Sequence, residues 1–339
     1  MTKMYHFLRL IRLVNILVIA LTMIIIQFFL SKYLTYETSS YSLDSSNYYI
    51  EIFKQIFSPR FIALLISTLL IAAAGNIIND YFDVKADRIN KPKRLIIGIH
   101  IKRRWAMVWH WSFNSVGLCI ALYLGYILQN IWIPIVAFVS INLLWFYSIY
   151  FKRKAFIGNI FVALLLGFIP FYILIFNYGQ NLYEILTDSL EFNHLGSHYY
   201  FETIILFTSI IAFLLNLIRE LVKDIMDIRG DLKLGAKTFP IKYGIKKSKW
   251  LIAGISVFVF TALIIYGLYI INSGLIGLFQ NTKQNLIEPM SIYLLFTVIL
   301  LYLVTLIIFL VKHKHSNYKM VSNLLKLIML IGLIIPLFL

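Results

Sequence analysis

Long apolar segments recur along this 339-residue chain, and they limit its fold more than any other feature. Hydrophobic residues make up 60% of the chain and the mean hydropathy is +0.83, far above ordinary globular composition. A helix of about 20 apolar residues crosses a bilayer core of about 30 Å. Such segments begin near residues 10, 60, 105, 131, 156, 201, 250, 290 and 319. We therefore predict an all-α, polytopic membrane protein with nine transmembrane helices, the first of which is retained rather than cleaved as a signal peptide.

The Lys and Arg residues are unevenly divided between the two sides of these spans. With the N-terminus inside, 26 of the 31 lie in inner segments, Lys326 lies within the last span, and four lie outside. Because Lys and Arg close to the spans stay cytoplasmic, we predict an integral multi-pass protein of the cell inner or plasma membrane. Its N-terminus is cytoplasmic and, after nine spans, its C-terminus is outside. The net charge of +16 then reflects topology and anionic lipid, with no nucleic acid partner.

The acidic residues of the cytoplasmic side all belong to two clusters, each at the end of an apolar segment. The first aspartate cluster is Asn79-Asp80-x-x-Asp83-x-x-x-Asp87. The second is Asp224-x-x-Asp227-x-x-x-Asp231, with Glu220 one turn before it. The other eight acidic residues lie on the predicted outer side.

The two clusters also suggest how the chain is organised. In each part an apolar segment, an acidic cluster, a basic loop and another apolar segment follow in the same order. We predict a single transmembrane domain, 1–339, made of two related halves, about 1–151 and 152–339. The outer loops at 34–58 and 178–200 are rich in Ser, Tyr, Asn and acidic residues, and we expect irregular caps there with a short interfacial helix near 48–57.

Helical geometry turns the first cluster into a polar stripe. Residues at i, i+4 and i+8 drift by only about 40° per step, so Asn79, Asp83 and Asp87 share one face. Carboxylates near a membrane are costly unless they face a wet cavity. Oxygen ligands select hard cations, and Mg²⁺ binds through one or two carboxylates plus substrate phosphates. Two facing stripes predict a diphosphate held by bridging Mg²⁺; the alternative is that the carboxylates pair on the surface with the basic residues beside them.

Basic residues follow both clusters and supply further donors for phosphate oxygens. Lys91, Lys93 and Arg94 come after the first, and Lys223, Arg229, Lys233 and Lys237 interleave with the second. Each also serves as a topology determinant. We favour Arg94, Lys233 and Lys237 as substrate-binding residues.

These stretches resemble the UbiA superfamily of intramembrane prenyltransferases. The matching residues are 79–92, NDYFDVKADRINKP, and 223–238, KDIMDIRGDLKLGAKT; weaker matches are Arg12-Leu-Val-Asn15 and residues 147–159. The resemblance covers essentially the whole chain. It implies nine helices around a central cytoplasm-facing cavity and an active site on the cytoplasmic side.

The resemblance also implies a reaction, in which a prenyl group passes from an allylic diphosphate to an acceptor and diphosphate is released. Asn79, Asp83, Asp87, Asp227 and Asp231 would hold Mg²⁺, and the four aspartates would be catalytic together with Tyr147, which would face the allylic cation. Asn15 and Lys152 would bind substrate. Asp80 and Asp224 lie off the stripes and would assist as acceptor-side bases or ligands.

The acceptor is less constrained than the reaction. Residues 219–231 look most like the branch that prenylates geranylgeranylglyceryl phosphate to make ether lipids, and Lys or Arg near the cavity suits a phosphate-bearing acceptor. The alternative is a quinone-pathway aromatic acceptor, 4-hydroxybenzoate or dihydroxynaphthoate. Besides the bilayer and these two substrates, no obligatory protein partner is indicated.

Two hypotheses of other classes compete with a prenyltransferase. A CDP-alcohol phosphotransferase also uses membrane aspartates and a divalent metal, but its Asp-Gly-x-x-Ala-Arg pattern is missing from this sequence. A transporter for Mg²⁺ or an anion also has two pseudo-repeats, but its polar groups lie near the midplane, whereas both stripes here end at the cytoplasmic side.

Overall fold

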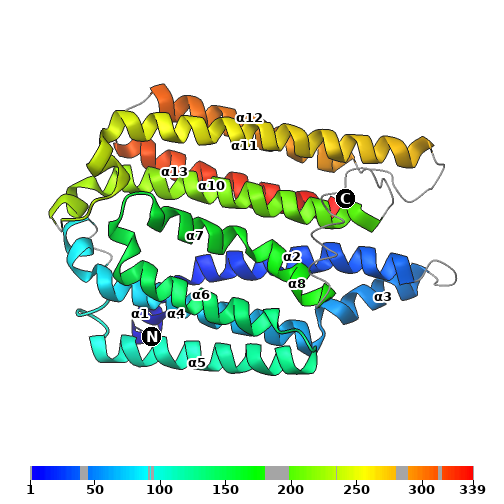
Figure 1. The fold of residues 1–339 in the computed structure, drawn as a ribbon, viewed down its shortest axis with the longest axis horizontal. Helices are drawn as coiled ribbons and strands as arrows, with labels where there is room; N and C mark the ends of the chain where they lie inside the picture. Colours follow the sequence, from blue (N-terminus) through cyan, green and yellow to red (C-terminus); the bar gives the residue numbers. More distant parts are fainter. Residues whose placement is uncertain are drawn as a thin grey trace.

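The fold is a bundle of helices that run nearly parallel to one long axis (Figure 1). The computed structural model describes residues 2–38, 45–90, 92, 95–179, 198–233, 235–279, 289–311 and 315–338, and within them β-structure is limited to two isolated bridges. The α-helices are α1 (Thr2–Leu10), α2 (Leu13–Thr38), α3 (Ser45–Ile56), α4 (Pro59–Asn90), α5 (Arg103–Ile127), α6 (Trp132–Ile149), α7 (Ile157–Gly167), α8 (Ile169–Tyr178), α10 (His198–Lys233), α11 (Phe239–Phe279), α12 (Pro289–Val311) and α13 (His315–Ile334). Short 3₁₀ turns form η2 (Phe151–Arg153) and η3 (Ile335–Phe338).

The membrane-spanning helices follow the apolar segments of the sequence. In the described part of the chain, seven helices are long and apolar enough to cross a membrane: α2, α4, α6, α10, α11, α12 and α13. Helices α7 and α8 meet at a bend of 46°, which is the geometry of a broken span or of a re-entrant loop, and they bring the count to eight if the pair is one span. Helix α5 has 25 residues but is not among these spanning helices, because polar residues such as His110 and Asn114 within it lower its hydropathy. The all-helical membrane fold is thus confirmed, and the count of nine spans is not.

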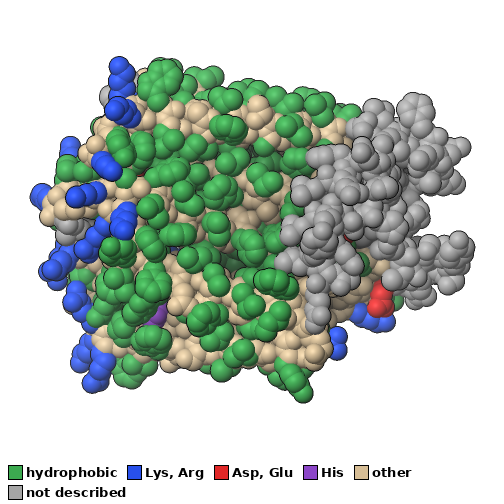
Figure 2. Space-filling view, viewed as in Figure 1, with side chains coloured by type: hydrophobic (Ala, Val, Ile, Leu, Met, Phe, Trp, Pro, Cys, Tyr) green, Lys and Arg blue, Asp and Glu red, His purple; other side chains and the backbone are tan. Residues whose placement is uncertain are grey.

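Helices α4 and α10 are longer than a bilayer requires. With 32 and 36 residues they reach about 48 Å and 54 Å at 1.5 Å per residue, against a hydrocarbon core of about 30 Å. Both end at the left of Figure 1. The Lys and Arg side chains gather at this same end, which we call the basic end (Figure 2). The extra turns therefore carry both aspartate clusters to the basic end.

Two short helices flank the spans. Helix α3 overlaps the interfacial helix expected at 48–57, and its position agrees within the usual uncertainty of helix ends. Helix α1 was not expected, because its nine residues precede the first apolar run. Arg12, in the left-handed region with φ of 55°, separates α1 from α2. The outer segment 180–197 and Arg94 lie outside the described residues.

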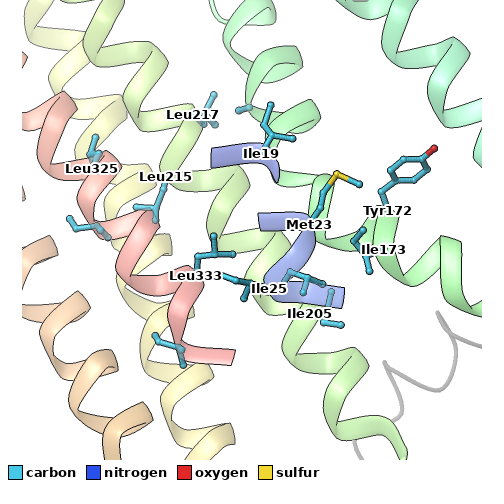
Figure 3. Close-up of a cluster of buried hydrophobic side chains, with 14 of the residues drawn as sticks. Ile19, Met23, Ile25, Tyr172, Ile173, Ile205, Leu215, Leu217, Leu325 and Leu333 are labelled. Atoms are coloured by element: carbon cyan, nitrogen blue, oxygen red, sulfur yellow. The ribbon is translucent and has the colours of Figure 1, made fainter. Parts of the chain in front are cut away.

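Helix α10 lies at the centre of the packing and contacts α7, α11, α13, α8 and α4. Apolar side chains from α2, α8, α10 and α13 meet in the main core, as the labelled residues of Figure 3 show. The approach of α7 to α10 depends on Gly167, since a Cβ there would lie 2.7 Å from the backbone nitrogen of Phe213. This close contact fixes α7 against α10 beside the cavity described next.

Candidate active site

One large cavity, with a volume of about 2520 Å³, opens between α2, α4, α6, α7, α10 and α13. Both aspartate clusters line it. From α4 come Asn79, Asp80, Asp83 and Asp87, and from α10 come Asp224, Asp227 and Asp231. The structure thus brings together residues that are more than 130 positions apart in the sequence.

In the first cluster, two side-chain oxygens converge on one cation. The ammonium of Lys152, on η2, donates to Asn79 Oδ1 at 3.2 Å and forms an ion pair with Asp83 Oδ2. Burial lowers the pKa of Lys152, but the charge and hydrogen bond of Asp83, together with Tyr147, raise it by more, so that this pKa lies above its usual value. The i, i+4 pair of oxygens is therefore arranged to receive a positive charge.

Asp80 is held from the opposite side of the cavity by Arg12. Their Nη2 and Oδ1 atoms lie 2.5 Å apart. Burial lowers the pKa of Arg12, but the Asp80 charge and hydrogen bond raise it by more. The turn that presents Arg12 is fixed by Asn76, whose side chain donates to the carbonyl of Ile11 at 2.9 Å. Ion pairs therefore form at Asp80 and Asp83, with cations from distant segments rather than with the basic residues that follow the cluster.

The second cluster contains its own counter-charges. Glu220 Oε1 accepts from Lys223 Nζ at 2.5 Å and lies 3.4 Å from Arg219 Nη1, all on α10. Asp224 accepts from the amide of Asn159 on α7 at 2.9 Å. The turn before Asn159 requires Gly158, because a Cβ there would lie 2.7 Å from the carbonyl oxygen of Phe151.

The remaining predicted site residues separate into two groups. Asn15, Tyr147 and Lys233 line the cavity. Lys237 does not, because its side chain is exposed and its backbone nitrogen donates to the carbonyl of Arg153 at 2.8 Å. The prediction for Arg94 falls outside the described residues.

The oxygen donors of the cavity fit a hard cation whose coordination shell is completed by the substrate. Among the described residues, no three His, Cys, Asp or Glu side chains come close enough to hold a metal by themselves. Asn79 and Asp83 nevertheless already share one ammonium group, and the acidic oxygens of α10 lie across the same cavity. Such oxygen-only pairs suit Mg²⁺, which takes further ligands from phosphates and water.

Several cavity residues were missed or given no role from the sequence. Arg12 and Asn159 lie in the weaker motif stretches, and Glu220 and Lys223 lie beside the second aspartate cluster. Their closeness to these motifs was the signal by which they could have been predicted. The polar residues of α13 were harder to find, because they occur in an apolar segment. They are Lys319, Ser322, Asn323 and Lys326, all of which line the cavity.

Together the fold and the cavity define a class: a polytopic helical membrane protein in which two aspartate clusters on long helices face one shared cavity. Residues 53–319 match the UbiA prenyltransferase family. The chain belongs to this family and is a membrane prenyltransferase. The family excludes the CDP-alcohol phosphotransferase and transporter hypotheses.

Curated relatives are named digeranylgeranylglyceryl phosphate synthase. The protein of Thermococcus gammatolerans is 33% identical over 224 residues, which cover 66% of this chain and 70% of the relative. That of Pyrococcus abyssi is 36% identical over 176 residues, covering 52% and 54%. The match thus spans between about half and two-thirds of these proteins.

Solved structures share the fold over nearly the full length. A structure of digeranylgeranylglyceryl phosphate synthase has a TM-score of 0.59 at 24% identity, covering 99% of this chain and 98% of the other. A UbiA homologue from Archaeoglobus fulgidus bound to DMAPP and Mg²⁺ has a TM-score of 0.54 at 14% identity, covering 98% and 99%.

Proposed function

We propose that this protein transfers a prenyl group from an allylic prenyl diphosphate to geranylgeranylglyceryl phosphate, with Mg²⁺ and with release of diphosphate. The observation that carries the proposal is the meeting of both aspartate clusters in one cavity with Lys152 between Asn79 and Asp83. The names of the curated relatives support this acceptor. The Archaeoglobus homologue supports the metal.

The diphosphate binds between the clusters, where Asn79, Asp83, Asp87, Asp227 and Asp231 would hold Mg²⁺. When bound there, Mg²⁺ would supply positive charge against the leaving diphosphate. Lys152 is already protonated and donates from a neighbouring position, so it can stabilise the same oxygens. Lys233, Arg94 and Asn15 are further substrate-binding residues in this proposal; Lys237 is left out because it does not line the cavity.

The prenyl chain extends along the apolar lining of the cavity, which excludes water from the allylic carbon. Ile71, Val136, Leu144 and Phe171 belong to this lining. Tyr147 turns an aromatic face toward the carbon as positive charge develops on it. The acceptor hydroxyl oxygen bonds to that carbon, and the carbon–oxygen bond to diphosphate breaks with its electron pair going to diphosphate. Asp80 or Asp224 accepts the hydroxyl proton.

The test is release of diphosphate from geranylgeranyl diphosphate by purified protein with Mg²⁺. Geranylgeranylglyceryl phosphate, 4-hydroxybenzoate and dihydroxynaphthoate are offered in parallel. We expect release with the first acceptor, its loss in Asp83→Ala and Asp227→Ala, and no change in Glu51→Ala, which lies on α3 away from the cavity. Release that depends on an aromatic acceptor instead would assign the protein to the quinone-pathway alternative.

The orientation and the internal symmetry are further parts of the proposal. The gathering of Lys and Arg at the basic end (Figure 2) supports a cytoplasmic N-terminus, an active site at the cytoplasmic side and an outer C-terminus. The equivalent places of α4 and α10 support two related halves, about 1–151 and 152–339. Lys247→Cys and Lys54→Cys, each in a Cys119→Ser background, test the orientation: an impermeant thiol reagent added to sealed cells should label only Lys54→Cys.

A further inference from the structure

Helix α13 has a polar face inside an otherwise apolar span. Lys319, Ser322, Asn323 and Lys326 are spaced at i, i+3, i+4 and i+7, which places them on one side of the helix. All four line the cavity, although α13 belongs to a span, Ser316–Phe338, whose most apolar 18 residues have a mean hydropathy of 2.2. A lysine within a span is costly, and such residues face wet cavities and bind polar substrates. Lys326 has no part in the reaction described above.

The register between α10 and α13 shows what lies opposite Lys326. The two helices pack directly against each other. A small crevice between them is lined by Ile218 and Val222 of α10 and by Val321 and Leu325 of α13. Lys326 is therefore level with the turn of α10 that carries Arg219 and Lys223, and all three side chains line the cavity.

Side-chain direction sets the depth of these three cations. Side chains of a helix tilt toward its N-terminus. Because α13 starts at the basic end and α10 finishes there (Figure 1), Lys326 tilts toward the basic end, while Arg219 and Lys223 tilt away from it. The ammonium groups of Lys326 and Lys223 therefore approach a common depth, on the inner side of Asp227, and the guanidinium of Arg219 lies about one turn deeper in the same cavity.

Arg219 carries an unused donor at this position. Its side chain is buried, with 9% of the residue exposed. Its Nη1 approaches Glu220 at 3.4 Å, but its Nε has no hydrogen-bond partner. Buried polar atoms in folded proteins almost always have a partner. Because Arg219 also lines the cavity, an anion bound there would give its guanidinium a further partner.

The charges that α13 contributes also favour an anion. Glu220 is shared between Arg219 and Lys223, so it offsets only one of their two charges. The described part of α13, residues 315–338, adds Lys319 and Lys326 and contributes no acidic residue. The described part of α13 therefore adds positive charge to the cavity, opposite a surface of α10 that carries Asp224 and Asp227 as well as Glu220.

We propose that Arg219, Lys223 and Lys326 form an inner anion site that binds the phosphate monoester of the acceptor. The inference rests on the function proposed above. The donor diphosphate lies nearer the basic end, between the aspartate clusters. An acceptor held by its phosphate on the inner side presents its nearby hydroxyl to the allylic carbon from the side opposite the leaving diphosphate. This orientation lowers the entropic cost of the attack.

The test separates the two substrates by their kinetics. Lys326→Met, Lys326→Arg and wild type are purified at full length, and the KM of each substrate is measured. One charge-assisted hydrogen bond contributes about 1.5–3 kcal/mol, so we expect Lys326→Met to raise the KM for geranylgeranylglyceryl phosphate about tenfold or more. The KM for geranylgeranyl diphosphate should not change. Lys326→Arg should restore most of the affinity, and Lys247→Met, on the exposed surface of α11, should match wild type.

A binding measurement gives a readout that does not depend on turnover. Geranylgeranylglyceryl phosphate and its dephosphorylated alcohol are titrated into protein without Mg²⁺ and without donor. Wild type should bind the phosphate more tightly, and Lys326→Met should lose that preference. If Lys326→Met fails to fold, Lys326→Gln keeps a polar side chain in the span and carries the same test.

The outcomes distinguish this inference from the proposed function. If wild type turns over the phosphate acceptor but Lys326→Met leaves its KM and binding unchanged, the inner anion site is wrong and the function stands. The same holds if only the donor KM changes. If wild type uses only an aromatic acceptor, both the function and the inner anion site are wrong.

Discussion

The two aspartate clusters occupy equivalent places on α4 and α10, yet their charges are balanced in different ways. Asp80 and Asp83 pair with Arg12 and Lys152, which lie 68 and 69 positions away in the sequence. On α10, Glu220 pairs with Arg219 and Lys223 of its own helix. The first cluster therefore depends on the packing of other segments, whereas the second balances its charge locally.

This difference assigns separate tasks to the two sides of the cavity. The cations of the first cluster come from a turn and a short 3₁₀ segment, which can shift when a substrate brings its own charge. The cations of α10 lie one and three residues from their acidic partner on the same helix, so they form a constant part of the cavity wall. We expect substitutions on the α4 side to change catalysis most, and substitutions on the α10 side to change stability as well.

Asp83→Asn gives the largest expected loss of activity. The substitution keeps the shape of the side chain but removes the charge that Asn79 and Asp83 present together. Loss of one electrostatic contact to a developing charge reduces kcat by about 10²–10³-fold. Diphosphate release under saturating substrate measures it. Activity within about twofold of wild type would contradict a role for Asp83 in the reaction.

The double variant Asp83→Asn/Lys152→Met is a control for folding in that experiment. Asp83→Asn leaves the Lys152 ammonium without its carboxylate, which lowers the melting temperature. Removing both charges should restore part of it, since an unpaired charge is worse than none, while activity stays low. If the two losses of stability simply add, the two residues do not interact.

Glu220→Gln should have the largest effect on stability. It removes the carboxylate that Arg219 and Lys223 share on α10, within a helix of the core. Removing one member of a buried ion pair costs about 3 kcal/mol, seen as a lower melting temperature in detergent. Glu51→Gln is the matched control, because Glu51 and Lys54 are exposed and 3.0 Å apart, and such pairs contribute about 0–1 kcal/mol.

Lys152→Met should have a smaller effect, confined to the donor substrate. Loss of one charge-assisted donor costs about 1.5–3 kcal/mol, or about tenfold to a hundredfold in kcat/KM for the prenyl diphosphate. Lys154→Met is the matched control from the same loop, because Lys154 stacks over the ring of Tyr150 at 3.9 Å and does not line the cavity. Equal losses in both variants would mean that the loop as a whole, rather than the Lys152 ammonium, is required.

Periodic features of the sequence predicted most of the fold and much of the site. Apolar length identified the spans, and the i, i+4 spacing placed Asn79 and Asp83 on one face, where both contact Lys152. The sequence did not predict the contacts between distant segments. Arg12 reaches Asp80 only because the chain turns at a left-handed residue, and Lys237 lies within a motif stretch but has an exposed side chain that does not line the cavity.

The smallest effect concerns the attachment of α1, which carries Arg12 toward the first cluster. His6 stacks on His100 with ring centroids 3.7 Å apart, joining α1 to the segment after α4. Burial, then His100 and Arg9, lower the pKa of His6. The neutral His6 ring therefore contributes to stability above its unfolded pKa of about 6.5, and this contribution is lost as the pH falls through its lower pKa in the folded protein. We expect the backbone amides of residues 2–10 to be less protected from hydrogen exchange at pH 5.5 than at pH 7.5, after correction for intrinsic rates. The decrease in protection should be smaller than about tenfold. His6→Phe keeps an aromatic ring but cannot titrate, so its protection should not change with pH. The same pH dependence in His6→Phe would assign the effect to other groups.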